Sequence, residues 1–300
     1  MQADKDNEVN LKVAKKLVQE KNTSFIFNEN VKKILYKSLR TKEYIHVIKI
    51  VDILTYFARC NLFVIMNEYS GVINSNILLP FSFRLKSNEG ITAGDVVIGL
   101  DKISIVDSKV YDLLKQIVSQ MNIVLKYIVP ELQLELLNYG NRYNEKGNEG
   151  IAVELLSLKG DKKLPIKYES EGIKKIISIL SAMISMYNNP SVCMVVDELD
   201  SGIYEYLLGE ILSVIETGGK GQLMFTSHNL RPLEVLNKDS IYFTTVNEKN
   251  RYIRFANVKE SNNLRSMYIR SIMLGGQSEI LYNETDKLEI RRAFKMAGDK

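Results

Sequence analysis

Two carboxylates follow directly on a short apolar run in the second half of the chain. The run is Val192 to Val196, and Asp197 and Glu198 come immediately after it. An apolar run of this length is typical of a strand buried on both faces of a parallel sheet, and ligands bind at the carboxyl ends of such strands. There, one carboxylate could hold Mg²⁺ while the other orients and deprotonates a water that attacks a γ-phosphate. An ordinary acidic turn after a strand is the alternative.

One of the two histidines follows the next apolar run along the chain. Residues Gln222 to Thr226 have the composition of a strand, and Ser227, His228 and Asn229 come after them. If the two strands are neighbours, a neutral His228 imidazole could hydrogen-bond the γ-phosphate and sense its loss. A histidine with a purely structural role is the alternative.

Ser170 and Gly172 stand at the start of a predicted amphipathic helix. Apolar residues recur three or four apart from Ile173 to Tyr187, and Pro190 lies just beyond. Ser170 is a suitable N-cap, and the unpaired N–H groups of a helix start bind anions. Gly172 would let a phosphate come close to the backbone. A cap without a ligand is the alternative.

The elements that must position these residues alternate between strand and helix. Strands are predicted over 151–158, 192–196, 222–226, 240–245 and 252–256, and helices over 170–187, 203–215 and 287–296. Strands separated by crossover helices predict an α/β domain with a largely parallel sheet.

The first half of the chain has a different pattern. Helices are predicted over 11–18, 31–39 and 44–60, β-prone runs over 78–105, and a further helix over 110–128. Residues 139–150 are rich in Asn, Gly, Glu and Lys, which favours a boundary or an exposed loop. We therefore predict a helical or mixed arm or lid over 1–145 and a second domain over 146–300.

Composition excludes several classes of protein. The chain has 300 residues, 45% hydrophobic and 25% charged, which is typical of a globular protein. Its net charge of +4 neither implies nor excludes a nucleic-acid partner. The two cysteines, Cys60 and Cys193, and the two histidines, His46 and His228, lack the close spacing of a Cys/His zinc site, and two cysteines are too few for a disulfide framework. A charged start and charges within the longest apolar stretch predict no signal peptide, no membrane span and a cytoplasmic location.

The order of these motifs resembles the C-terminal half of an ABC-type ATPase head, and is similar to the SMC-like and OLD-like "AAA-family" ATP-binding proteins of bacteria. The resemblance covers about residues 151–298. It rests on Ser170–Gly172 as the signature motif, Asp197–Glu198 as the Walker B motif, Asp200 as the D-loop and His228 as the switch histidine. It implies a P-loop NTPase fold, with a mostly parallel sheet that is incomplete at its amino end.

The resemblance also implies a role for each residue. Asp197 would complete a Mg²⁺ site, Glu198 would be the general base, and His228 would contact the γ-phosphate. Asp200 would couple two sites across a dimer, and Ser170–Gly172 would face the nucleotide of the opposite protomer. ATP and Mg²⁺ are the implied cofactors. Hydrolysis would require a homodimer, or a partner chain that carries the P-loop.

The P-loop of that family is missing from this sequence. No Gly-x-x-x-x-Gly-Lys-Ser/Thr motif occurs. The nearest imitation, Gly218 to Gly221, precedes a strand and is interpreted as a turn. Three explanations stay open: a carboxyl portion of a longer ATPase with Met1 as an internal methionine, a second polypeptide that supplies the P-loop, or a degenerate subunit. All three predict weak or absent catalysis by the chain alone.

Two other functions stay open at this point. One is a non-catalytic interaction or regulatory module that keeps the ATPase-like fold. The other is a DNA-engaging component of a defence or repair complex, which would use basic residues near the C-terminus. These are Arg251, Arg254, Arg265, Arg270, Arg291 and Arg292. Their alternative is a solvated surface or ion pairs.

Overall fold

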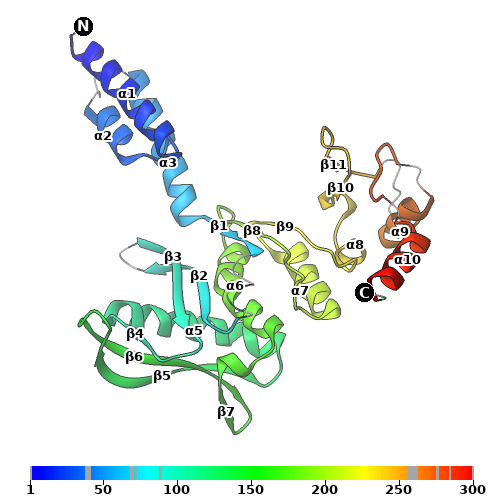
Figure 1. Ribbon diagram of the computed structural model, residues 1–300. Coiled ribbons are helices and arrows are strands. Elements are labelled where there is room, and N and C mark those ends of the chain that lie inside the picture. The colour runs from blue at the N-terminus through cyan, green and yellow to red at the C-terminus, as the bar shows by residue number, and fades with distance from the viewer. Residues whose placement is uncertain are drawn as a thin grey trace. The chain divides into compact units, whose positions relative to one another are not determined.

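The computed structural model describes residues 2–37, 42–67, 71, 73, 75–87, 90–255, 263–274, 277–283 and 285–298 (Figure 1). The chain forms two compact units, Met1–Gly202 with Gly219–Thr226, and Ile203–Gly218 with Ser227–Lys300. The predicted boundary at 145/146 lies inside the first unit, at the turn of a β-hairpin. The assignment of 1–145 as an arm or lid and of 146–300 as an ATPase lobe stays a prediction.

Three helices open the first unit and are drawn in blue in Figure 1. They are α1 (Gln2–Glu20), α2 (Glu29–Lys37) and α3 (Lys42–Cys60). Ala14, Val31, Leu35 and Ile48 form their shared apolar core. The helices predicted at 11–18 and 44–60 are confirmed, and so is the one at 31–39 as far as residue 37.

A three-stranded parallel sheet follows in the order β1-β8-β9. Its strands are β1 (Leu62–Ile65), β8 (Cys193–Val196) and β9 (Gln222–Phe225), four residues each. The side chains of Phe63, Ile65, Met194 and Val196 lie on one face, where they are buried. Val64 and Met224 lie on the other face and are 48% and 45% exposed. The prediction of a mixed α/β fold with a parallel sheet is confirmed, although β1 was not predicted.

The other sheets of the first unit are antiparallel. They are the pair β2 (Leu78–Ser87) and β3 (Gly90–Gly99), and the sheet β4 (Ser104–Val106), β6 (Glu149–Lys159), β5 (Leu132–Tyr143) with β7 (Lys162–Pro165) beside β6. The strand predicted at 151–158 is therefore present, but it does not join the parallel sheet. Hairpin connections, which require antiparallel pairing, explain the difference. Among the described strands only β1, β8 and β9 pair in parallel, so the predicted mostly parallel sheet is wrong in its extent.

Two long helices complete the first unit. The helix α5 (Ser108–Ile128) packs on β5 through a fully buried stripe. The stripe consists of Leu114, Ile117, Met121 and Leu125. The helix α6 (Glu171–Asn188), preceded by a 3-10 turn at Ile166–Tyr168, contacts β2, α5 and β8 and is buried around most of its circumference. It leads directly into the parallel sheet, because β8 begins five residues after it ends.

The second unit contains short elements. They are α7 (Glu205–Gly218), α8 (Pro232–Val235), a 3-10 turn at Lys238–Ser240, β10 (Phe243–Thr244), β11 (Tyr252–Ile253), α9 (Leu264–Leu274) and α10 (Lys287–Gly298). The strands predicted at 240–245 and 252–256 are shorter than expected and pair antiparallel, and residue 256 lies outside the described residues. Phe243 stacks on Phe255 at 3.9 Å and on Tyr268 at 5.3 Å between ring centroids. In the part of the chain that the structure describes, no helix is both long and apolar enough to cross a membrane.

Candidate functional site

Asp197 and Glu198 lie at the carboxyl end of β8, as the sequence predicted. The Asp197 N–H donates to the Ile65 carbonyl at 2.9 Å, which extends the β1–β8 ladder by one residue. The hydroxyl of Thr226, just after β9, donates to Asp197 Oδ1 at 2.6 Å and accepts from the Glu198 N–H at 2.7 Å. One threonine therefore joins both acidic residues to the neighbouring strand.

The chain turns sharply at Glu198. This residue has a φ of 48°, in the left-handed region that a non-glycine residue seldom adopts. The Leu199 N–H donates to the Thr226 carbonyl at 3.0 Å, and the Ser201 N–H donates to the Glu198 carbonyl at 3.0 Å. Leu199 is buried and anchors the turn, while Asp197, Glu198 and Asp200 are half-buried.

The start of α6 packs against the loop that carries Asp200. Ser170 is the N-cap of α6, and its Oγ accepts from the Ile173 N–H at 3.3 Å. Gly202 has a φ of 75°, and a Cβ built on it would lie 3.2 Å from the Gly172 nitrogen. The predicted cap is thus confirmed, and the first turn of α6 lies directly against the loop that follows the Asp-Glu pair.

Two adjacent lysines of α6 are buried, and sequence reasoning missed both. Lys175 is 5% exposed, and its Nζ donates to the Glu198 carbonyl. Burial lowers the pKa of the Lys175 ammonium, and the carboxylates of Asp200, Glu198 and Asp197 act in the opposite direction. Lys174 is 2% exposed, and its Nζ donates to Asn76 Oδ1. A signal existed in the sequence, since both lysines fall within a helix that is apolar on most of its faces.

The predicted site residues divide between the two units. The first unit brings five of them together around the end of β8, and the second unit carries the histidine. The five are Ser170, Gly172, Asp197, Glu198 and Asp200. His228 is exposed and lies in a turn in which the Asn229 N–H donates to Ser227 Oγ at 3.0 Å.

The residues at the end of β8 fit part of a magnesium–nucleotide site. Mg²⁺ bound with a nucleotide takes one or two carboxylates from the protein, and phosphate and water oxygens complete its coordination. Asp197 and Glu198 can supply that share. Among the described residues no group of three or more His, Cys, Asp and Glu side chains could hold a metal ion. The phosphate-binding loop has no counterpart in the sequence.

Several C-terminal basic residues take part in ion pairs or stacking. Arg265 lies 2.8 Å from Glu234 and 3.6 Å from Glu205, and Arg231 lies 2.5 Å from Glu234. These contacts tie α7, α8 and α9 together within the second unit. Arg254 stacks on the Tyr242 ring at 4.4 Å.

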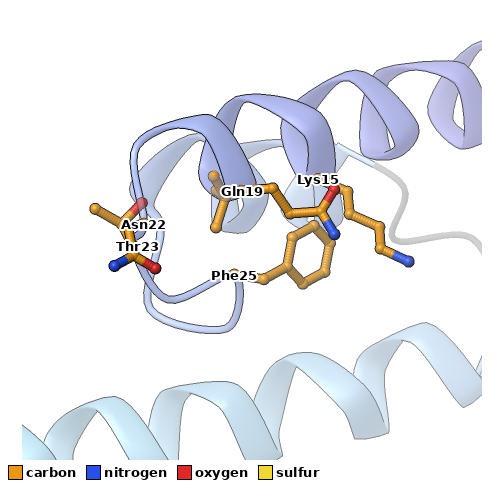
Figure 2. A pocket seen from close by; sticks show the side chains of 6 residues that line it. Lys15, Gln19, Asn22, Thr23 and Phe25 are labelled. Carbon is orange, nitrogen blue, oxygen red and sulfur yellow. The ribbon is translucent and has the colours of Figure 1, made fainter.

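A pocket of about 520 Å³ lies beside the end of α1 (Figure 2). Its lining residues are Lys15, Val18, Gln19, Asn22, Thr23 and Phe25. Figure 2 shows the Phe25 ring beneath Gln19. None of the predicted site residues lines this pocket.

Comparison with known proteins gives weak structural likenesses only. No family model and no curated protein matches the sequence. Among solved structures, the chain is similar to an SMC head bound to the C-terminal winged-helix domain of ScpA, with 14% identity and a TM-score of 0.30 over 38% of this chain and 34% of that one. It is also similar to a structure from a study of ATP-driven dimerization and DNA-stimulated activation of SMC ATPases, with 13% identity and a TM-score of 0.39 over 56% of this chain and 96% of that one. A third similar structure is an SMC head with an extended coiled coil, bound to the C-terminal domain of ScpA from Pyrococcus furiosus. Its identity is 12% and the TM-score is 0.30, over 76% of this chain and 45% of that one.

This chain spans about a third of the first of those chains and less than half of the third. Likenesses with identities and TM-scores this low do not establish a family for it.

Proposed function

We propose that this chain is part of an ABC/SMC-like ATPase head, namely the part that carries the signature motif and the catalytic carboxylates. It hydrolyses Mg·ATP together with a P-loop that a partner or further chain supplies. The observation that carries the proposal is the packing of the capped start of α6 on the loop that follows β8. Gly172 lies against Gly202, and Lys175 reaches Glu198, so the signature-like and Walker B-like segments meet in one unit.

In this proposal each residue has a distinct task. The Asp197 carboxylate, oriented by the Thr226 hydroxyl, takes part in holding Mg²⁺. The Glu198 carboxylate accepts the proton of the attacking water, and His228 hydrogen-bonds the γ-phosphate. The metal neutralises charge on the phosphates when it is bound. Ser170 and Gly172 offer helix-start N–H groups to a nucleotide held by the opposite protomer, and Asp200 couples the two sites.

The partner must add what this chain lacks. Among the described strands β9 is an edge of the parallel sheet, and a short parallel strand could pair with it. A P-loop at the end of such a strand would lie beside Thr226 and the carboxylates. The exposed Met224 on β9 is a suitable apolar contact for that segment.

The test is calorimetric Mg·ATP binding to the chain alone, and to the chain joined with a P-loop-bearing segment encoded upstream or as a partner. We expect binding and turnover only in the joined form. Glu198→Gln should keep binding, favour the dimer and lower turnover roughly 10²- to 10⁴-fold, the usual contribution of a general base. Glu210→Gln, an exposed glutamate of α7, is the matched control and should leave turnover unchanged.

Each other outcome has a definite meaning. Binding by the chain alone would reveal a phosphate loop of a different sequence. Full turnover in Glu198→Gln would refute the role of Glu198. Absence of binding in every form would favour the non-catalytic interaction module, and a salt-steep affinity for duplex DNA would favour the DNA-engaging component.

A further inference from the structure

We propose that Thr226 and Lys175 are positioning residues that hold the main chain of Glu198 from two sides and so place the Asp197 and Glu198 carboxylates. The roles of those two carboxylates rest on the proposed function. Lys175 acts through Glu198, and Thr226 acts through both Asp197 and Glu198.

The Thr226 hydroxyl can serve both acidic residues at once. A hydroxyl has one proton to donate and lone pairs to accept with. Its proton goes to Asp197 Oδ1 at 2.6 Å, so a lone pair receives the Glu198 N–H at 2.7 Å. A change of the Thr226 side-chain rotamer would move Oγ1 and break both bonds together. The side chain of Asp197 and the main chain of Glu198 are therefore set by one atom.

Lys175 holds the opposite side of the same residue. Its side chain is buried, which is costly for an ammonium unless it is paired and hydrogen-bonded. Its Nζ donates to the Glu198 carbonyl, and the carboxylates of Asp200, Glu198 and Asp197 favour its charged form. Because Lys175 lies five residues after the Ser170 cap, it links the start of α6 to the turn at residues 197–200, here called the acidic turn.

The backbone conformation of Glu198 explains why it needs hydrogen bonds from both Thr226 and Lys175. A left-handed conformation costs a non-glycine residue about 1–2 kcal/mol, so it persists only where the surroundings fix it. Without the hydroxyl or the ammonium, the turn can relax to an ordinary φ. The Glu198 carboxylate would then be displaced relative to that of Asp197.

The chain offers a matched control for each residue. Lys174 is the adjacent buried lysine, but it bonds to Asn76 and not to the acidic turn. Thr55 is a buried threonine whose hydroxyl donates to the Val51 carbonyl within α3. Lys174→Met and Thr55→Val thus remove the same chemical groups from buried positions that do not contact Glu198.

The first experiment measures amide hydrogen exchange on the full chain by NMR and needs no nucleotide. Thr226→Val should speed exchange at Glu198 about five- to tenfold, the value of one hydrogen bond. Thr226→Ser should restore it. Lys175→Met should speed exchange at Glu198 and Ser201, whereas Lys174→Met and Thr55→Val should not. Unchanged exchange at Glu198 in both Thr226→Val and Lys175→Met, in folded protein, would overturn the proposal.

The second experiment uses the joined form that turns over ATP. Thr226→Val and Lys175→Met should lower kcat roughly 10²-fold by misplacing the base, with KM nearly unchanged. Thr226→Ser and Lys175→Arg should recover most of kcat. A raised KM with unchanged kcat would overturn the positioning role. If no joined form hydrolyses ATP, the proposed function fails, while the exchange experiment still decides whether Glu198 is held.

Discussion

The two larger sheets of the first unit are built in opposite ways. The antiparallel sheet of β4, β5, β6 and β7 comes from one continuous stretch of chain, and α5 covers it with a fully buried stripe. The parallel sheet of β1, β8 and β9 has four-residue strands from three distant stretches, and Val64 and Met224 on one of its faces are about half exposed. The residues that could do chemistry follow the strands of the second sheet.

The difference between the two sheets assigns them different roles, with the antiparallel sheet important for stability and the parallel sheet for the candidate site. The antiparallel sheet and α5 form an apolar layer that is built from one continuous stretch of chain. The parallel sheet brings Ile65, Val196 and Phe225 to one level and thereby places Asp197 beside Thr226. We therefore expect substitutions in the first sheet to reduce stability most, and substitutions at the ends of the second to affect the site.

The largest effect on stability should come from the buried stripe of α5. Leu125→Ala removes a side chain with no exposed surface and should cost about 2–5 kcal/mol of unfolding free energy through lost burial and a cavity. Val64→Ala, on the exposed face of β1, should cost about 1 kcal/mol or less. Urea unfolding measures both. Equal losses would contradict the contrast between the sheets.

A second test compares one glycine in each sheet. A Cβ on Gly221, just before β9, would lie 2.5–2.7 Å from the carbonyl oxygens of Val192, Asn189 and Met186. A Cβ on Gly150 would lie 2.7 Å from the Val106 oxygen.

Gly221→Ala and Gly150→Ala should each cost about 1–3 kcal/mol of unfolding free energy. Only Gly221→Ala should also speed amide exchange at Glu198, because it displaces the entry to β9. Faster exchange at Glu198 in Gly150→Ala would show that the two sheets are not separable in this way.

A third test concerns the edge of the antiparallel sheet. Asn122 of α5 donates to the Leu134 carbonyl and accepts from the Leu134 N–H, each at 2.8 Å, and so closes the edge of β5. Asn122→Leu leaves both backbone groups without this partner and should cost about 1–3 kcal/mol in urea unfolding. Asn148→Leu, in the exposed turn after β5, is a control that should cost less. Equal effects would mean that the edge is closed by other means.

The smallest effect should come from the ion pairs of the second unit, which has neither kind of large sheet. Hydrogen bonds from Arg265 and then Arg231 hold the pKa of Glu234 below its ordinary value of 4.5. Glu234 therefore stabilises the unit above about pH 4.5, and this contribution is lost as the pH falls through its lowered pKa. Glu234→Gln should lower Tm slightly at pH 7 and by less at pH 3, because the contribution is lost as the carboxylate becomes protonated. If the Tm of the variant differs from that of the unchanged protein by the same amount at both pH values, the ion pairs are excluded as the cause.

Periodicity and composition predicted most helices and the strands β8 and β9, because each has a continuous apolar pattern with clear ends. The strand β1 was missed because Leu62–Ile65 follows α3 after a single turn residue, Asn61, and prolongs the same apolar run. The outer part of β5 was interpreted as a loop. Its residues have loop composition, yet they pair with β6 around the turn at 144–148.

The carboxylates and the N-cap of the candidate site were predicted from the sequence, but the contacts that position them were not. Asp197, Glu198 and Ser170 could be found because each stands at the end of a recognisable element. Lys175 was missed although it lies within a helix that is apolar on most of its faces, because a lysine on a helix is normally solvated and its burial depends on tertiary packing. The left-handed φ of Glu198 likewise depends on contacts between distant segments.

The distant origin of β1, β8 and β9 also has a consequence for the order of folding. Hairpin contacts close short loops, whereas the β1–β8 pairing joins segments that lie far apart in the sequence and so costs more chain entropy to form. The antiparallel layer should therefore become protected early in refolding and the parallel ladder late. Pulsed hydrogen exchange that protects Val195 before Leu155 would contradict this order. On this view, the acidic turn is among the last parts of the molecule to form.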